Sequence, residues 1–224
     1  GSADLLEKLG ADLDVPRDQL ERVYKECGFV FLFAKQFHPF MKHFGPIRAE
    51  LGIPTVMNIM GPILNPAGVT HMVAGVFAPF IGPLYAETLR ELGYKRALVV
   101  HGQNPALDEL SICSPTLVWE LKEDKSISHY EFTPENAGLK RHSLELCGSG
   151  TPEENAVRLR AMFSGKHTEE PALMDFLLLN SGAALYVAGK AATIKEGADL
   201  AREAITNGKA RKTLEAYAKH CHPL

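Results

Sequence analysis

Two short apolar runs joined by a helical segment constrain the fold of this chain more than any other feature. Residues 72–77 (MVAGVF) and 97–100 (ALVV) are continuous apolar runs, too short for a helix, and are typical of strands covered on both faces. Between them, residues 82–92 have a helical pattern that ends at Gly93. A strand, a helix and a strand joined by short links form the crossover unit of parallel sheets. We therefore predict an α/β fold with a mainly parallel central sheet.

Other segments in the first two thirds of the chain fit this α/β prediction. Residues 29–34 (FVFLFA) form a third apolar run after a predicted helix over 16–27, and we expect another strand buried on both faces. Residues 116–121 and 127–132 alternate more cleanly between apolar and polar side chains, with a polar break between them. This alternation predicts a pair of strands near an edge of the sheet, with one face in solvent.

The last third of the chain has helical patterns almost throughout. Thr151, Pro152 and Glu154 match a capping box, in which Thr and Glu satisfy backbone donors at the start of a helix. Further helices are predicted over residues 172–188, 192–206 and 208–219. The predicted architecture is therefore a mainly parallel central sheet flanked by helices, with a helical C-terminal third.

Charge, hydropathy and cysteine spacing exclude several classes of protein. Lys and Arg number 24 and Asp and Glu 27, which gives a formal net charge of −3, whereas a surface that reads phosphates leaves a basic excess. No apolar run reaches the roughly 18 residues of a membrane span, and no basic segment precedes an apolar one at the N-terminus. The four cysteines are widely spaced without a CxxC pair, as is usual for thiols in a reducing compartment. We expect a cytoplasmic protein without a nucleic-acid or membrane partner.

Asp108 and Glu109 are the first candidate site. They follow the predicted strand at 97–100 after a short loop, and ligands of parallel sheets gather at the carboxyl ends of strands. Two adjacent carboxylates can hold a hard divalent cation that shares its oxygen ligands with substrate phosphates. A solvated acidic loop or a helix N-terminus, where acids are favoured, also explains the pattern, and from the pattern alone it is the more common case.

Arg48 is the second candidate. It lies in a segment, residues 46–50, that matches the first turn of a helix, and its guanidinium can form two parallel hydrogen bonds with a carboxylate ligand or with an acidic side chain of the protein. The sequence has no P-loop, no GxGxxG and no Ser–His–Asp order, so an NTPase, a Rossmann dehydrogenase or a triad hydrolase has no support.

Several motifs follow one another along the chain in an order that resembles one known family. They are residues 1–7 (GSADLLE), 46–48 (PIR), 58–66 (NIMGPILNP), 97–102 (ALVVHG), 107–111 (LDELS), 178–180 (LLN) and 184–191 (ALYVAGKA). Together they resemble the anthranilate phosphoribosyltransferases, from the first residue to about Ala218. The resemblance implies transfer of the phosphoribosyl group of phosphoribosyl pyrophosphate (PRPP) to the amine of anthranilate. It further implies that pyrophosphate is released, that Mg²⁺ is the cofactor and that the reaction belongs to tryptophan biosynthesis.

The resemblance also implies roles for particular residues. Ser2 matches the serine that contacts PRPP, and Arg48 matches the arginine that binds anthranilate. Asp108 and Glu109 match the acidic pair that holds Mg²⁺ on the pyrophosphate. No side chain is assigned as a nucleophile, because the reaction depends on positioning and charge stabilisation. We expect Arg48 and the acidic pair to face one cleft at one rim of the sheet.

The same resemblance describes residues 1–224 as one incomplete α/β domain of a phosphoribosyltransferase. The family's helical domain, through which it is commonly homodimeric, and its glycine-rich pyrophosphate loop match no part of the chain and lie before its first residue. We therefore expect these residues alone to bind PRPP weakly.

Two alternatives stay open at this point. A pyrimidine nucleoside phosphorylase shares the fold but binds a nucleobase, and a non-catalytic relative would use the same scaffold to bind nucleic acid or a protein. The net charge disfavours nucleic acid, and the retained Asp108 and Glu109 disfavour loss of the metal site.

Overall fold

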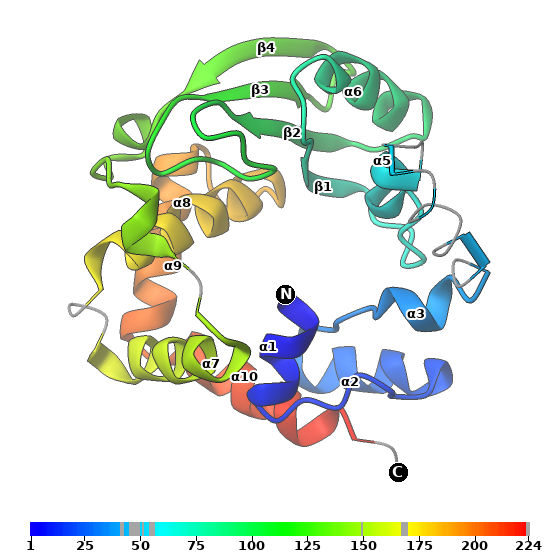
Figure 1. Ribbon diagram of the computed structural model, residues 1–224, viewed down its shortest axis with the longest axis vertical. Coiled ribbons are helices and arrows are strands. Elements are labelled where there is room, and N and C mark those ends of the chain that lie inside the picture. Colours follow the sequence, from blue (N-terminus) through cyan, green and yellow to red (C-terminus); the bar gives the residue numbers. More distant parts are fainter. Residues whose placement is uncertain are drawn as a thin grey trace. The chain divides into compact units, whose positions relative to one another are not determined.

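A computed structural model gives the fold of the chain (Figure 1). It describes residues 1–40, 43–44, 50, 52–53, 57–148, 150–166 and 170–222. These residues divide into two compact units. The sheet unit comprises Ile59–Gly148 and Thr168–Glu203, and the helical unit comprises Gly1–Asn58, Ser149–His167 and Ala204–Leu224.

The sheet unit is built on four strands in the order β1-β2-β3-β4. Their bounds are β1 His71–Gly75, β2 Arg96–Gly102, β3 Thr116–Leu121 and β4 Ile127–Phe132. Strands β1 and β2 are parallel and are joined through helix α6, Ile81–Glu91, so the predicted crossover unit is confirmed. The pairs β2–β3 and β3–β4 are antiparallel, which makes the described sheet mixed rather than mainly parallel. The reason is local, since neither of these two connections contains a crossover helix that could return the chain to the starting edge.

Helices cover both faces of β2, which explains its continuous apolar sequence. Val99 belongs to the core cluster that includes Leu89 of α6, and Leu98 and Val100, which point to the opposite face, are equally buried. Helix α6 packs against β2 and β3, and the long helix α8, Pro171–Val187, packs against β1 and β2. Two buried faces remove the polar alternation that a half-exposed strand shows.

The helical unit holds most of the shorter helices. They are α1 Ser2–Lys8, η1 Arg17–Gln19, α2 Leu20–Cys27, α3 Ala34–Phe37, α7 Pro152–Ala161, η4 Met162–Lys166 and α10 Lys209–His220. The predicted capping box is confirmed, because the backbone N–H of Glu154 donates to Thr151 Oγ1 at 3.2 Å and that of Thr151 donates to Glu154 Oε2 at 2.8 Å. Gly28, at φ +71°, ends α2 in a left-handed conformation, as a helix-terminating glycine does.

The strand predicted over residues 29–34 is wrong. Residues 29–33 belong to no strand of the described sheet, and α3 begins at Ala34. Helices cover this aromatic run only in part: the Phe29 ring, 40% exposed, meets the Tyr217 ring of α10 edge to face at 4.9 Å, and the half-buried Phe31 and Phe33 pack against the same cluster. An apolar run without alternation therefore does not specify whether a sheet or helices cover its side chains, nor how completely.

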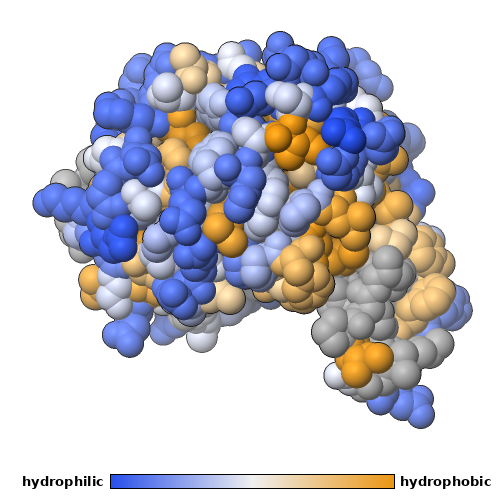
Figure 2. Space-filling view, turned by 90° about the horizontal axis from the view of Figure 1, so that it is seen from above, coloured by the Kyte–Doolittle hydropathy of each residue, from blue (hydrophilic) through white to orange (hydrophobic). Residues whose placement is uncertain are grey.

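Four further helical elements complete the described chain. They are α5 Met57–Ile63, η2 Pro134–Ala137, η3 Leu144–Cys147 and α9 Ile194–Thr206, of which α5 and α9 contain residues of both units. The helices predicted over 172–188, 192–206 and 208–219 correspond to α8, α9 and α10. Within the described ranges, no helix has the length and hydrophobicity needed to traverse a bilayer. Figure 2 shows a face on which hydrophilic residues dominate and hydrophobic residues form separate patches.

Candidate metal-binding site

The acidic pair, Asp108 and Glu109, follows β2 after a short turn. Gly102, the last residue of β2, forms an antiparallel bridge with Leu107: the N–H of Gly102 donates to the carbonyl of Leu107 at 2.9 Å, and the N–H of Leu107 returns a bond of 3.0 Å. The bridge closes residues 103–106 into a turn. Asp108 and Glu109 therefore emerge at the carboxyl end of β2, where the sequence predicts them.

The backbone of Asp108 also lies directly against Gly75, the last residue of β1. A β-carbon at this position would lie 1.6 Å from the carbonyl oxygen of Asp108 and 2.4 Å from its carbonyl carbon. Any side chain at Gly75 would displace the loop, so the close approach requires glycine. The signal was present in the sequence, because a glycine inside an apolar strand commonly marks a close backbone contact.

A side chain of α8 holds the other end of the acidic segment. Asn180 Oδ1 accepts from the N–H of Leu110 at 3.0 Å, and Asn180 Nδ2 donates to the carbonyl of Leu110 at 3.1 Å. Just beyond, the N–H of Ser111 donates to Thr116 Oγ1 at 2.8 Å. In the sequence, Asn180 stands out only as part of a motif, and no local signal connects it with the acidic loop.

A buried histidine ties the two parallel strands together beneath this loop. His101 is 4% exposed, and its Nδ1 lies 2.8 Å from the carbonyl oxygen of Val76, the residue after β1. Because a carbonyl only accepts, Nδ1 carries the proton of this bond. The bond fixes the strand ends on which the acidic pair stands.

The electrostatics of the pair favour a bound cation. Asp108 and Glu109 keep exposed surface, yet partial burial of the Glu109 carboxyl raises its pKa, and the neighbouring Asp108 charge raises it further. A divalent cation between the two carboxylates would remove this repulsion and favour the ionised form of both.

The donor set fits Mg²⁺. Among the residues with described positions, no group of three or more His, Cys, Asp or Glu side chains could hold a metal ion. A cation at the pair would therefore take two carboxylates from the chain and its other oxygen ligands from water or from a bound phosphate. Mg²⁺ is commonly held in this way, with one or two carboxylates and several non-protein oxygens.

Of the other two predicted site residues, one belongs to the helical unit and one is not among the described residues. Ser2 is the first residue of α1 in the helical unit, where it is exposed. Arg48 is not among the described residues. Of the four predicted site residues, the structure thus brings together Asp108 and Glu109, and the convergence of Arg48 with them stays a prediction.

Two pockets have linings that include neither Asp108 nor Glu109. One, of about 570 Å³, lies in the sheet unit beside the turn that precedes the pair, and it is lined by Asn104, Pro105, Cys113, Ser143, Leu144, Glu145 and Gly148.

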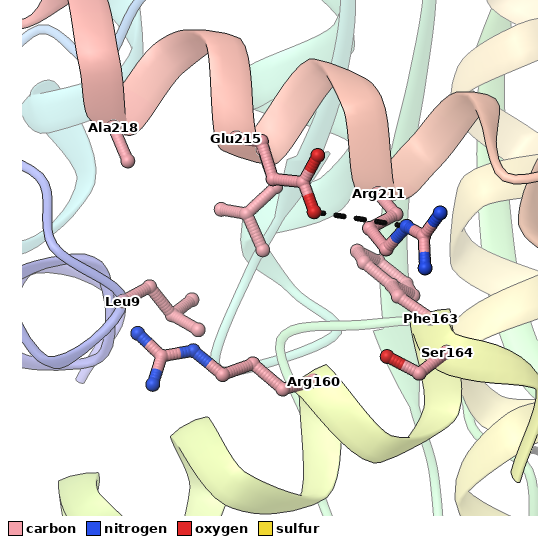
Figure 3. A pocket seen from close by; sticks show the side chains of 8 residues that line it. Leu9, Arg160, Phe163, Ser164, Arg211, Glu215 and Ala218 are labelled. Atoms are coloured by element: carbon pink, nitrogen blue, oxygen red, sulfur yellow. Dashed lines mark ion pairs between the residues drawn. The ribbon is translucent and has the colours of Figure 1, made fainter.

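The other pocket, of about 360 Å³, lies in the helical unit between α7 and α10 (Figure 3). Its two guanidinium groups do not converge: Arg160 donates to the carbonyl of Lys8 at 3.2 Å, whereas Arg211 Nε lies 3.7 Å from Glu215 Oε1 (Figure 3). This arrangement does not present two cations to one anionic ligand.

Comparison with known proteins agrees with an α/β transferase. Residues 1–211 match the model of the glycosyl transferase family, a/b domain. The chain belongs to this family of glycosyl transferases.

Its named relatives are anthranilate phosphoribosyltransferases, which confirms the resemblance found in the sequence. The protein of that name from Parvibaculum lavamentivorans is 46% identical over 214 residues, 96% of this chain and 61% of the relative. The one from Thermus thermophilus is 46% identical over 218 residues, 97% of this chain and 63% of the relative. The chain thus spans less than two thirds of the length of these relatives.

Solved structures give the same result for the fold. The crystal structure of the Thermus thermophilus anthranilate phosphoribosyltransferase matches with a TM-score of 0.90 at 46% identity, over 99% of this chain and 64% of that one. The Saccharomyces cerevisiae enzyme in complex with PRPP and Mg matches with a TM-score of 0.90 at 31% identity, over 99% of this chain and 62% of that one. The yeast enzyme has also been solved in complex with 4-fluoroanthranilate.

Proposed function

We propose that this chain carries the metal-binding part of an anthranilate phosphoribosyltransferase, whose full-length form transfers the phosphoribosyl group of PRPP to the amine of anthranilate. Pyrophosphate is the second product, and the reaction serves tryptophan biosynthesis. The observation that carries the proposal is the anchored Asp108–Glu109 pair at the carboxyl ends of β1 and β2. The names of the relatives and the yeast complexes with PRPP, Mg and 4-fluoroanthranilate support the choice of substrates.

Asp108 and Glu109 act in this proposal as ligands of Mg²⁺. When bound, the cation neutralises negative charge on the departing pyrophosphate, which is the largest charge change of the reaction. The chain's part is to keep two ionised carboxylates in place on a rigid sheet edge. Gly75, Leu107 and Leu110 do this through the backbone contacts described above.

Arg48 and Ser2 complete the proposed site. The planar guanidinium of Arg48 binds the carboxylate of anthranilate through two parallel hydrogen bonds, and Ser2 contacts PRPP. Neither group acts as a nucleophile. Rate acceleration comes from placing the amine next to the anomeric carbon of the ribose and from stabilising charge on the leaving group.

The proposal includes a cytoplasmic location and a homodimer. All four cysteines are thiols, which suits a reducing compartment. Sedimentation equilibrium of the full-length gene product should give twice the mass of one chain, and a monomer would remove the dimer from the proposal.

The experiment that tests this function uses the full-length gene product with anthranilate, PRPP and Mg²⁺, and follows the loss of anthranilate fluorescence. We expect transfer by the unaltered protein and loss of nearly all activity in Asp108→Asn/Glu109→Gln. A matched control is Glu123→Gln/Asp124→Asn, which alters an exposed acidic pair in the β3–β4 turn and should leave activity unchanged. Phosphorolysis of thymidine or uridine without consumption of anthranilate would instead favour a nucleoside phosphorylase.

A further inference from the structure

We propose that Asn180 is a positioning residue for the acidic pair, an inference that rests on the proposed metal site. Its side-chain amide binds both backbone polar groups of Leu110, the residue that directly follows Glu109. These bonds reach the backbone and neither carboxylate, so Asn180 acts through the backbone.

The two ends of the acidic segment are held in the same manner. On one side, Leu107 exchanges two backbone hydrogen bonds with Gly102 at 2.9 and 3.0 Å. On the other, Leu110 exchanges two with the Asn180 amide at 3.0 and 3.1 Å. Only Asp108 and Glu109 lie between these anchors. Asp108 and Glu109 are therefore each bonded to a residue, Leu107 or Leu110, whose backbone is held by two hydrogen bonds.

The chemistry of the contact requires an amide. Leu110 offers one donor and one acceptor, and the planar amide of Asn presents one acceptor and two donors in matching positions. A carboxylate could accept from the N–H but could not donate to the carbonyl, and an apolar side chain could do neither. The second Nδ2 proton donates to the carbonyl of Phe176 at 3.2 Å, one turn earlier in α8, which fixes the orientation of the amide itself.

The helix that carries Asn180 is a rigid support. Leu178, Leu179 and Ala183 of α8 are at most 1% exposed, and Leu110 is fully buried. Movement of the Asn180 side chain is thus limited by the packed core on which its helix lies. Cutting the amide contact releases the acidic segment at its C-terminal end while the bridge to Gly102 and the buried Leu110 side chain remain.

The test compares Asn180→Ala with the unaltered full-length gene product. We expect the Mg²⁺ concentration for half-maximal transfer to rise about 10-fold or more, because the two ligands no longer hold one geometry. The KM for anthranilate should stay within about twofold, because Asn180 contacts the backbone next to the proposed metal ligands. The Leu110 amide should exchange with solvent at least about 10-fold faster. If the alanine variant does not fold, Asn180→Ser, which keeps one hydrogen-bonding group, should give the same changes in smaller measure.

A control on the same helix separates positioning from stability. Asp175→Asn alters the contacts of Asp175 with His142, at 2.9 Å, and with Arg202, at 3.5 Å, and neither contact involves Leu110 or Asn180. It should lower the midpoint of urea unfolding without changing the Mg²⁺ requirement or the exchange of Leu110.

Two results would overturn the inference: an unchanged Mg²⁺ requirement in the folded Asn180 variants, or unchanged exchange at Leu110. The proposed metal site itself is tested by a different variant, Asp108→Asn. If this variant has the same Mg²⁺ requirement as the unaltered protein, Asp108 does not bind the cation, and the proposed role of Asn180 is also wrong.

Discussion

The carbonyl oxygen of Asp108 occupies the space that a side chain of Gly75 would need, since a β-carbon there would lie 1.6 Å from that oxygen. The contact joins the end of β1 to the loop after β2. Because backbone lies on both sides of it, neither partner can give way as the tip of a flexible side chain would. The acidic pair is thereby placed by a residue that has no functional group.

Gly75→Ala should therefore disturb the metal site as well as the fold. Overpacking of this kind lowers the free energy of unfolding by about 1–3 kcal/mol, and the displaced loop should raise the Mg²⁺ requirement of transfer. Urea unfolding and a Mg²⁺ titration measure the two effects. Gly82→Ala is the matched control, because its β-carbon would lie 2.3 Å from the Trp119 ring, away from the loop. It should lose stability but keep the normal Mg²⁺ requirement, and a normal requirement in Gly75→Ala would contradict this account.

As the pH falls, Mg²⁺ binding should begin to weaken at a higher pH than it would if Glu109 had the pKa of an ordinary glutamate. Burial and the Asp108 charge raise the pKa of Glu109 above its ordinary value of 4.5, and a carboxylate must be ionised to bind Mg²⁺. Titrations of Mg²⁺ binding at a series of pH values measure this dependence. Glu109→Gln should bind weakly and lose the part of the pH dependence that the raised pKa causes.

Without metal, the same raised pKa should destabilise the folded chain at higher pH. A raised carboxyl pKa contributes stability that is present below the pKa of the unfolded chain and is lost as the pH rises through the folded pKa. Glu109→Gln should therefore gain stability relative to the unaltered protein as the pH rises above the ordinary glutamate pKa of 4.5, as measured by urea unfolding in a chelator. A constant difference over this rise in pH would show that Glu109 has no raised pKa.

Arg48→Ala should impair the use of anthranilate. Loss of a charge-assisted, two-pronged contact costs about 1.5–3 kcal/mol, which corresponds to a rise of about 10- to 100-fold in the KM for anthranilate. The KM for PRPP should change little. Arg48→Lys should recover only part of the loss, because an ammonium cannot form both bonds in one plane. Unchanged steady-state kinetics would remove Arg48 from the site.

Tyr186→Phe should test a buried polar network that lies outside the metal site. The Glu120 carboxylate is 6% exposed and accepts from Tyr186 Oη at 2.6 Å and from Tyr130 Oη at 3.0 Å. Removing the Tyr186 hydroxyl should lower the free energy of unfolding by about 1–3 kcal/mol without changing the Mg²⁺ requirement. Tyr24→Phe, at a tyrosine that is 55% exposed, should change stability by less than about 0.5 kcal/mol.

Local signals in the sequence predicted much of the fold. The capping box at Thr151 and the end of a helix before Gly93 depend on neighbouring residues and are confirmed. The parallel pair β1–β2 followed from a helix between two apolar runs. The strand over residues 29–34 was predicted wrongly because an apolar run does not specify what packs against it, and here the contacts include Tyr217 of α10, nearly two hundred residues later along the chain.

The candidate site was predictable in part for the same reason. The acidic pair follows a recognisable strand, so the rule for carboxyl ends of strands predicts its position. The contact of Asn180 with Leu110 joins residues 70 positions apart. No local sequence pattern indicates this contact, so it could be found only from the structure. The contact of Gly75 was predictable only in part. A glycine inside an apolar strand indicates a close backbone contact, but it does not indicate which segment makes that contact.

Isothermal titration of Mg²⁺ into the full-length gene product, in the presence of PRPP, tests the central claim most directly. The unaltered protein should bind one cation per chain, and Asp108→Asn/Glu109→Gln should bind it at least about 100-fold more weakly. Equal affinity in the two proteins would contradict the assignment of Asp108 and Glu109 as the ligands.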